Sequence, residues 1–400
     1  MADYARRTPH RRRAVIVALL ALILAAVAGP AAGGLALDPA ALAAAPSSSG
    51  VTAVAFSPDG TLLAGAYSDG TVRLWEVATG QVYGLVLQAG SGPQGGATGV
   101  AFSPDGTLLA SAADNGTIGL WNPAAGRPSG SPLHAGSGVN GVAFSPGGKL
   151  LASADANGTV QLWDVATGQV HGLALQAGSG SPGGATGVAF SPDGTLVAAG
   201  FSDGTVQLWE VATGQPAGSP LQAGSGVTGV AFSPGGTLLA GAGENGTVSL
   251  WNPATGRLVS SPLQAGSGVT GVAFSPDGTL LASSSENGTI QLWNPATGRP
   301  VGSPLQAGSG VNGVAFSPGG KVLASADADG TIKVWNTPGP GVDWIIPLAA
   351  ALAFVLAALA VAITAREIRR AHGGGANSRR TLWKSCWWWP RWRSASRCCS

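Results

Sequence analysis

Cysteine and charged side chains are both scarce in this sequence, and each shortage excludes something. Cys386, Cys398 and Cys399 all lie near the C-terminus, so the rest of the chain has no disulfide framework and can fold in either redox compartment. Charged residues make up only 10% of the chain. The four histidines do not accompany any Ser, Cys, Asp or Glu pattern typical of catalysis or metal binding. We therefore expect no enzyme activity, no metal site and no cofactor.

The net charge of +2 hides an uneven distribution of charge along the chain. Between Val51 and Asn336 there are seven Lys/Arg and fifteen Asp/Glu, whereas the flanking residues are rich in arginine. An acidic central region repels phosphate backbones, so nucleic acid is not expected as a partner.

Glycine, in contrast, is abundant, and it recurs at fixed intervals inside a repeat. The segment GVAFSPDGTLLASSSENGTIQLW, residues 271–293, has six close variants elsewhere in the chain. Seven tryptophans mark the repeat at spacings of 46, 42, 46, 42, 42 and 42 residues: Trp75, Trp121, Trp163, Trp209, Trp251, Trp293 and Trp335. A period of about 40–45 residues is typical of four-stranded propeller blades.

Each repeat contains four short apolar runs separated by turn residues. In the sixth repeat we predict strands at residues 269–275, 279–285, 289–293 and 299–306. A Pro-containing SPDG turn separates the first two strands. Asn287-Gly288 separates the next two and predicts a type I′ hairpin. Four strands per repeat predict an all-β chain.

This repeat resembles the WD40 family, in the pattern VAFSPDG…LLAS…DGT…LW at seven registers. The resemblance implies a seven-bladed β-propeller, here over residues 37–336. The chain has no fourth strand after Trp335. In this family one terminus usually supplies the strand that the other lacks, so residues 37–46 are expected to be the outer strand of blade 7.

The sequence also departs from the family pattern at its polar positions. The Gly-His pair that the family usually has just before the first strand is replaced by Ala-Gly-Ser-Gly, as at residues 135–138, and no repeat has a histidine at that position. The family's Trp-Ser-Asp-His hydrogen-bond network therefore cannot be complete. The serine that the family often has in the second strand of the repeat, called strand b, is replaced at Gly65, Ala199 and Gly241. The turn aspartate is kept at Asp69, Asp203 and Asp329 and is asparagine at Asn115, Asn157, Asn245 and Asn287. Because burial of the seven tryptophans contributes more than these hydrogen bonds, we expect the fold to persist.

Two apolar segments predict membrane attachment. Residues 1–28 combine a basic start with an apolar stretch from Ala14 to Ala28, which is typical of a cleavable signal peptide or an uncleaved signal anchor. Residues 29–36 and 337–343 read as linkers, and 344–365 as a transmembrane helix followed by arginines. A buried core helix is the alternative for this second segment. The basic flanks favour a cytoplasmic tail and an extracytoplasmic propeller at the cell membrane.

The tail, residues 366–400, is rich in Trp, Arg and Cys and is expected to be disordered. It is open to three interpretations: a membrane-surface segment, a lipidated segment carrying Cys398 and Cys399, or an out-of-frame extension. Its composition, which resembles nothing upstream, favours the last. The Ala/Gly-rich usage is typical of a GC-rich bacterial source.

Strand order in a propeller predicts which face each loop occupies. The turns between the second and third strands and the loops between blades are expected on one face, which we call the top. The chain leaves the third strand of blade 7 at the opposite, bottom face. We therefore expect the bottom face near the bilayer and the top face free. The residues that vary most near the top turns are candidates for partner binding: Tyr67, Asp114, Asp155, Phe201, Glu244, Glu286 and Asp327. They form either a docking surface or a solvated rim.

The sequence accordingly predicts a membrane-anchored scaffold that binds a protein or peptide whose identity no motif reveals. A ligand-binding receptor that signals through a partner is the alternative. An extracellular enzyme or glycan-binding propeller fits the sequence less well, because catalytic clusters and top-face aromatics are scarce.

Overall fold

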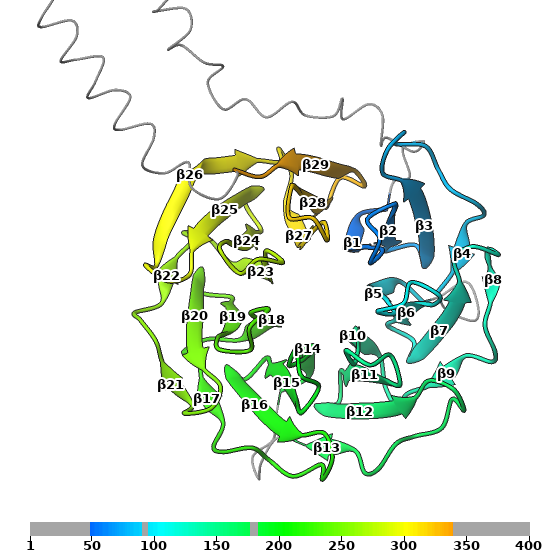
Figure 1. Cartoon of the computed structure of the whole chain (residues 1–400), viewed down its shortest axis with the longest axis horizontal. Coiled ribbons are helices and arrows are strands. Elements are labelled where there is room, and N and C mark those ends of the chain that lie inside the picture. The colour runs from blue at the N-terminus through cyan, green and yellow to red at the C-terminus, as the bar shows by residue number, and fades with distance from the viewer. Residues whose placement is uncertain (1–48, 90–94, 177–182, 339–400) are drawn as a thin grey trace, which may run out of the picture. The chain divides into compact units, whose positions relative to one another are not determined.

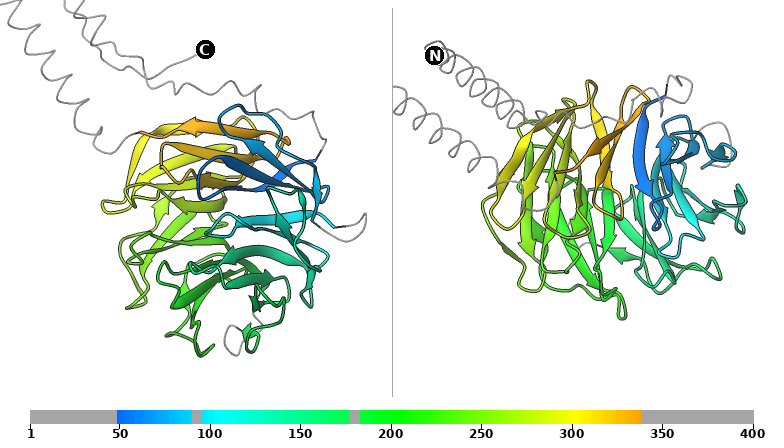
Figure 2. Two further views of the ribbon diagram at one scale, coloured as in Figure 1. Left: turned by 45° about the vertical axis from the view of Figure 1, so that its right-hand side comes forward. Right: turned by 45° about the horizontal axis from the view of Figure 1, so that its top comes forward.

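The computed structural model describes residues 49–89, 95–176 and 183–338. In this part of the chain every regular element is a β-strand, and the strands form seven sheets around a central axis (Figure 1). The prediction of an all-β, seven-bladed propeller is confirmed. Figure 2 shows that each sheet is strongly twisted from the axis to the rim, as right-handed strand twist requires.

The strands of each blade are named a to d from the axis outward. The a strands are β1 (Val51–Phe56), β5 (Ala97–Phe102), β10 (Val139–Phe144), β14 (Ala185–Phe190), β18 (Val227–Phe232), β23 (Val269–Phe274) and β27 (Val311–Phe316). The b strands are β2 (Leu62–Tyr67), β6 (Leu109–Ala113), β11 (Leu150–Asp155), β15 (Leu196–Phe201), β19 (Leu239–Gly243), β24 (Leu281–Ser285) and β28 (Val322–Asp327). The c strands are β3 (Thr71–Glu76), β7 (Thr117–Asn122), β12 (Thr159–Asp164), β16 (Thr205–Glu210), β20 (Thr247–Asn252), β25 (Thr289–Asn294) and β29 (Ile332–Asn336).

The d strands at the rim are mostly much shorter than the inner strands. They are β4 (Leu87–Gln88), β8 (Arg127–Pro128), β9 (Leu133–His134), β13 (Leu175–Gln176), β17 (Leu221–Gln222), β21 (Arg257–Leu258), β22 (Leu263–Gln264) and β26 (Arg299–Gln306). Blade 6 alone has a d strand of eight residues, β26, with the same bounds that the sequence predicts.

The core consists of seven similar layers between neighbouring blades. Each layer packs the c-strand tryptophan of one blade against small and branched side chains of the preceding blade. Trp209, for example, is 1% exposed and lies in one cluster with Ala152, Ala154 and Val160 of blade 3. Alternation of side chains across a strand explains this arrangement, because one face of each sheet carries the Trp and the other carries Ala and Val.

Blade 7 is a three-stranded sheet, β27-β28-β29, among the described residues. The predicted closing strand, residues 37–46, lies outside them. The ring is nevertheless closed at the inner strands, where Asn312 Nδ2 donates to the carbonyl of Val51 at 2.6 Å. Residues of blades 1 and 7, including Trp75 and Ile332, also share one apolar cluster.

The hairpin between strands b and c differs from the predicted type I′ turn. In blade 1 Gly70 N donates to the carbonyl of Tyr67, so Ser68-Asp69-Gly70 form a three-residue loop. Gly70 has φ of 83°, which fits a type I turn ending in a left-handed glycine. The type I′ prediction is therefore wrong, since the glycine ends the turn and does not occupy its centre.

The predicted signal segment (1–28), the first linker (29–36), residues 339–343 of the second linker, the membrane span (344–365) and the tail (366–400) lie outside the described residues. Within the described ranges, no helix is long and apolar enough to cross a membrane.

Candidate functional site: the top face of the propeller

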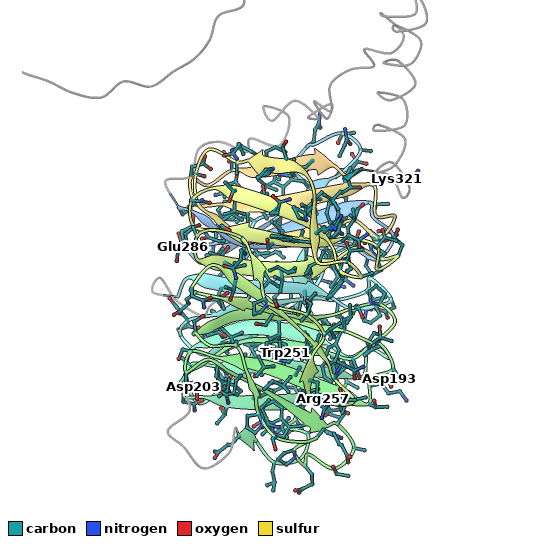
Figure 3. All side chains as sticks on the ribbon, turned by 90° about the vertical axis from the view of Figure 1, so that its left-hand side faces the viewer. Asp193, Asp203, Trp251, Arg257, Glu286 and Lys321 are labelled. Atoms are coloured by element: carbon teal, nitrogen blue, oxygen red, sulfur yellow. The ribbon has the colours of Figure 1, made fainter. Side chains whose placement is uncertain are left out.

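The turns of the propeller fall on two opposite faces, which Figure 3 shows from the side. Asp203 and Glu286, in turns between strands b and c, lie at one edge, whereas Asp193, Arg257 and Lys321 lie at the other. The face of the b–c turns and the d–a loops is the top face, and the face of the a–b and c–d turns is the bottom face.

The top face is built from the same backbone contact in every blade. A glycine just before strand a accepts a hydrogen bond from the first residue of the b–c turn. Gly96 O accepts from Asp114 N at 3.1 Å, and Gly226 O accepts from Glu244 N at 2.9 Å. This contact holds the end of each loop beside the b–c turn of the same blade.

Only glycine fits where these loops approach the neighbouring blade. A Cβ atom on Gly138 would lie 2.4 Å from the carbonyl oxygen of Asp114, well inside contact distance. In the same loop, a Cβ on Gly136 would meet nothing within 4 Å. The Ala-Gly-Ser-Gly loop before β10 therefore owes its last glycine to backbone contact between blades 2 and 3.

The turn Asp and Asn residues have a structural role. Asp69 Oδ1 accepts from the backbone N of Thr71 at 2.9 Å and from its hydroxyl at 2.6 Å. Asn115 Oδ1 accepts the same pair of bonds from Thr117. Because these bonds use only a side-chain oxygen, Asn replaces Asp without loss of the turn. The Asn-Gly-Thr sequences of the b–c turns are therefore explained by these hydrogen bonds within the turn.

Six exposed carboxylates remain on the top face, and we call them the top acidic ring: Asp69, Asp114, Asp203, Glu244, Glu286 and Asp329. The two basic residues near this face, Arg73 and Lys333, are partly buried. Arg73 lies over the ring of Tyr67 at 4.6 Å, and Lys333 pairs with Asp327 at 2.9 Å. Among the described residues the top surface therefore carries uncompensated negative charge.

Three of the seven predicted partner-binding residues, Asp114, Glu244 and Glu286, belong to this ring. The other four are buried, which corrects the prediction that they lie on an exposed surface: Tyr67, Asp155, Phe201 and Asp327 are 2%, 2%, 0% and 0% exposed. These four end strand b, whereas the exposed three begin the turn. A shift of one residue along a strand reverses the direction of the side chain, so the two positions differ in burial.

The buried aromatic residues extend the core toward the top face. Tyr67 packs against Trp75 with ring centroids 6.2 Å apart, and Phe201 packs against Trp209 at 6.3 Å. Burial raises the pKa of Tyr67 to about 12, against the opposing effect of Arg73. Its hydroxyl is therefore neutral at physiological pH.

The bottom face carries charges of both signs. Its exposed basic residues are Arg127, Lys149, Arg257, Arg299 and Lys321. Acidic a–b turns alternate with them. Asp193 Oδ1, for instance, accepts from Ser191 Oγ at 2.5 Å and from Thr195 N at 3.0 Å. These bonds lower the pKa of Asp193, so it stays ionised.

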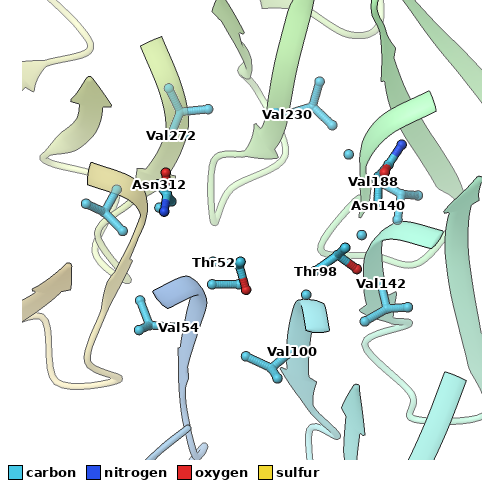
Figure 4. Close-up of a pocket in the computed structure, with 18 residues that line it drawn as sticks. Thr52, Val54, Thr98, Val100, Asn140, Val142, Val188, Val230, Val272 and Asn312 are labelled. Carbon is cyan, nitrogen blue, oxygen red and sulfur yellow. The ribbon is translucent and has the colours of Figure 1, made fainter. Parts of the chain in front are cut away.

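A central cavity of about 290 Å³ runs between the a strands (Figure 4). Glycine and valine line most of it, together with Thr52, Thr98, Asn140 and Asn312. The second residue of each a strand donates to a carbonyl of the next blade, and the bonds with ordinary geometry measure 2.5–2.8 Å. The seven donors form what we call the channel belt: Thr52, Thr98, Asn140, Thr186, Thr228, Thr270 and Asn312.

Sequence reasoning missed the channel belt. A Thr or Asn in a strand is unremarkable, and its acceptor belongs to the next blade, 41 residues away for Thr186 and Val227. The one available signal is that the second strand-a position is Thr or Asn in all seven repeats.

Two family models match the chain. One, described as outer membrane protein assembly factor BamB, matches residues 58–303, more than half of the sequence. The other, described as WD domain, G-beta repeat, matches residues 298–336. The chain therefore belongs to the family described by the longer model, and its last repeat is also similar to the WD40 repeat. No curated protein shows a significant match to the chain.

Part of the WD40 hydrogen-bond network is present in this propeller. In the four blades that keep the strand-b serine, the indole donates to it: Trp121 to Ser111, Trp163 to Ser153, Trp293 to Ser283 and Trp335 to Ser325, at 2.9–3.1 Å. Where Gly65 replaces the serine, Trp75 Nε1 is buried without a partner. The seven structural tryptophans thus keep their packing role with or without the bond.

Among residues 49–89, 95–176 and 183–338, no group of three or more His, Cys, Asp or Glu side chains is placed to hold a metal ion. His134 and His171 are exposed and lie in or beside outer strands.

Proposed function

We propose that the protein is a membrane-anchored, extracytoplasmic scaffold that binds a basic segment of a partner protein on its top acidic ring. One observation carries this proposal: six exposed carboxylates gather on one face while Arg73 and Lys333 are partly buried there. Charge complementarity steers such a partner and excludes acidic ones. No catalytic role is proposed.

Sequence features support the anchoring. The apolar run 14–28 follows a basic start, and residues 345–365 form an uncharged run followed by arginines. The name of the longer family model, outer membrane protein assembly factor, also favours a place outside the cytoplasm and a role in assembly. Protease treatment of intact cells tests this placement: digestion of the propeller is expected from outside. Protection there would contradict the topology without affecting the top-face proposal.

Partner binding is tested by neutralising the top face in the full-length protein. The variant combines Asp114→Asn, Glu244→Gln and Glu286→Gln, which are exposed and accept no side-chain hydrogen bond that holds a turn. The matched control neutralises three bottom-face acids, Glu76→Gln, Asp164→Asn and Glu210→Gln. Crosslinking in cells followed by mass spectrometry should recover the same partners with the control and lose them with the top variant. Unchanged partners in both would contradict the proposal.

The central cavity favours a second candidate, a receptor for a small polar ligand. Its size and its Thr and Asn side chains suit a neutral polar molecule better than a charged one. Gly187→Val should fill the cavity, because a Cβ there already lies 3.2 Å from Gly229 Cα. A receptor would lose its cellular response with this change and keep it in the top-face variant, whereas a scaffold would show the opposite pattern.

A further inference from the structure

Blades 3 and 7 each bury one carboxylate at the same position of the repeat. Asp155 ends β11 and pairs with Val139, and Asp327 ends β28 and pairs with Val311. Their exposed fractions are 2% and 0%. The two blades lie far apart in the ring (Figure 1), so each carboxylate must be compensated within its own blade.

In blade 7 a lysine supplies the compensating charge. Lys333 Nζ lies 2.9 Å from Asp327 Oδ2. The same ammonium donates a hydrogen bond to the carbonyl of Ala307, in the loop that precedes β27. The singly charged ammonium group of Lys333 thus lies between a carboxylate and a backbone carbonyl.

Blade 3 repeats these surroundings without the lysine. Thr159 Oγ1 donates a hydrogen bond to Asp155 Oδ2 at 3.1 Å. In blade 7, Thr331 Oγ1 donates to Asp327 Oδ2 at 3.5 Å. The residue four positions before strand a is Ala135 in blade 3 and Ala307 in blade 7. The lysine position is occupied by Gln161, whose neutral amide donates to the carbonyl of Leu162 at 3.2 Å.

The carboxylate of Asp155 is therefore buried without a charged partner. Its Oδ1 atom is buried and accepts no hydrogen bond. Among the described residues the one ion pair is that of Lys333 with Asp327. Burial raises the pKa of Asp155, and the hydroxyl groups of Ser153 and Thr159 oppose this only in part. An ionised carboxylate in such a place requires a counter-ion.

We propose that Asp155, with Thr159 and the carbonyl of Ala135, binds a potassium ion where blade 7 holds the ammonium of Lys333. The site offers oxygen ligands, which suit a hard cation. A single carboxylate matches one positive charge, and the position is filled in blade 7 by a group of about the size of potassium. The internal repeat thus identifies both the place and the charge of the ligand.

The test measures thermal unfolding of the full-length protein in potassium chloride, sodium chloride and tetramethylammonium chloride at equal ionic strength. Potassium should raise the midpoint by a few degrees over tetramethylammonium, in a saturable way. Asp155→Asn should abolish the difference. Equal midpoints in potassium and tetramethylammonium would overturn the proposal and leave protonation as the compensation of Asp155. A stronger response to sodium would overturn the choice of ion.

Two exchanges between the blades keep the test informative if Asp155→Asn folds poorly. Gln161→Lys copies blade 7 into blade 3, so the midpoint should rise and lose its dependence on potassium. Lys333→Gln makes the opposite change and should add a second potassium-dependent component. Retention of the full potassium effect in Gln161→Lys would contradict the site. Anomalous scattering from rubidium in crystals of the wild type should place the ion beside Asp155.

Discussion

Strand a of every blade has six residues and lies beside the channel, whereas seven of the eight described d segments at the rim have only two. The inner strands keep the same register in all blades, including a bulge after their first residue. At the rim, apolar side chains such as Leu173 and Leu85 are 88% and 73% exposed. Strand pairing and side-chain burial therefore decrease from the axis to the rim.

This contrast shows that neighbouring blades are joined mainly through their inner strands. The channel belt and the tryptophan layers join neighbouring blades near the axis, at Asn312 and Val51 as at every other junction. The rim adds little to these contacts, since most of its residues face solvent. Stability thus depends on the inner part of the blades, and the following predictions test this by pairing an inner change with an outer one.

The largest effect is expected from Trp209→Ala. The indole is 1% exposed and fills the layer between blades 3 and 4, so its removal should cost about 3–5 kcal/mol of unfolding free energy. Leu173→Ala at the rim should change it by less than about 0.5 kcal/mol. Urea denaturation followed by circular dichroism measures both. Similar losses for the two variants would contradict the contrast between core and rim.

A smaller loss is expected from Gly138→Ala, because its Cβ would lie 2.4 Å from a backbone oxygen of the neighbouring blade. Relieving that overlap should cost about 1–3 kcal/mol. Gly136→Ala, in the same loop but with open space, is the control and should be tolerated. Thermal unfolding midpoints compare the two. If both variants melt like the wild type, the close contact between blades is not a constraint.

Ser283→Ala should cost about 1 kcal/mol, because it removes the acceptor of the Trp293 indole at 2.9 Å inside a buried layer. The same substitution at the exposed rim residue Ser131 should have no measurable effect. Urea midpoints of both variants, with the tryptophan fluorescence maximum as a second signal, provide the measurement. An equal, negligible effect at both positions would show that the indole bond contributes nothing.

The smallest effect concerns the bottom turns and depends on pH. Hydrogen bonds from Ser191 and Thr195 hold the pKa of Asp193 below its usual value of 3.8. This stabilisation is present above that value and is lost as pH falls through the lower, folded-state pKa. Asp193→Ala should therefore cost less than about 1 kcal/mol at pH 7, because the group is exposed. The difference from wild type should shrink in acid; a constant difference would exclude the ionised turn as its cause.

Much of the fold follows from the spacing of residues along the chain. The tryptophan interval, the SPDG and Asn-Gly turns and the alternating apolar runs predict the blades and even the bounds of β26. The details of the turn do not follow, because Asn-Gly suits both two-residue and three-residue hairpins. In the other blades that have described outer strands, these strands pair over only two residues, or over two separate two-residue segments in blades 2 and 5.

The candidate site was predictable only in part. Acidic residues near the b–c turns identify the top face, but Asp155 and Asp327 differ from Asp114 by a single step in the repeat. That step separates a buried strand end from an exposed turn. Sequence periodicity gives the elements to within a residue or two, and burial depends on a finer register than that.

A ring of seven blades follows from the repeats along the chain, because each repeat has an apolar face that only another repeat can cover. The pairing of polar groups, in contrast, depends on the folded structure. The channel belt joins residues of different blades, and the pair Lys333 and Asp327 has a counterpart in blade 3 with the carboxylate but without the lysine. Such relations depend on distances between strands, which the order of residues does not contain.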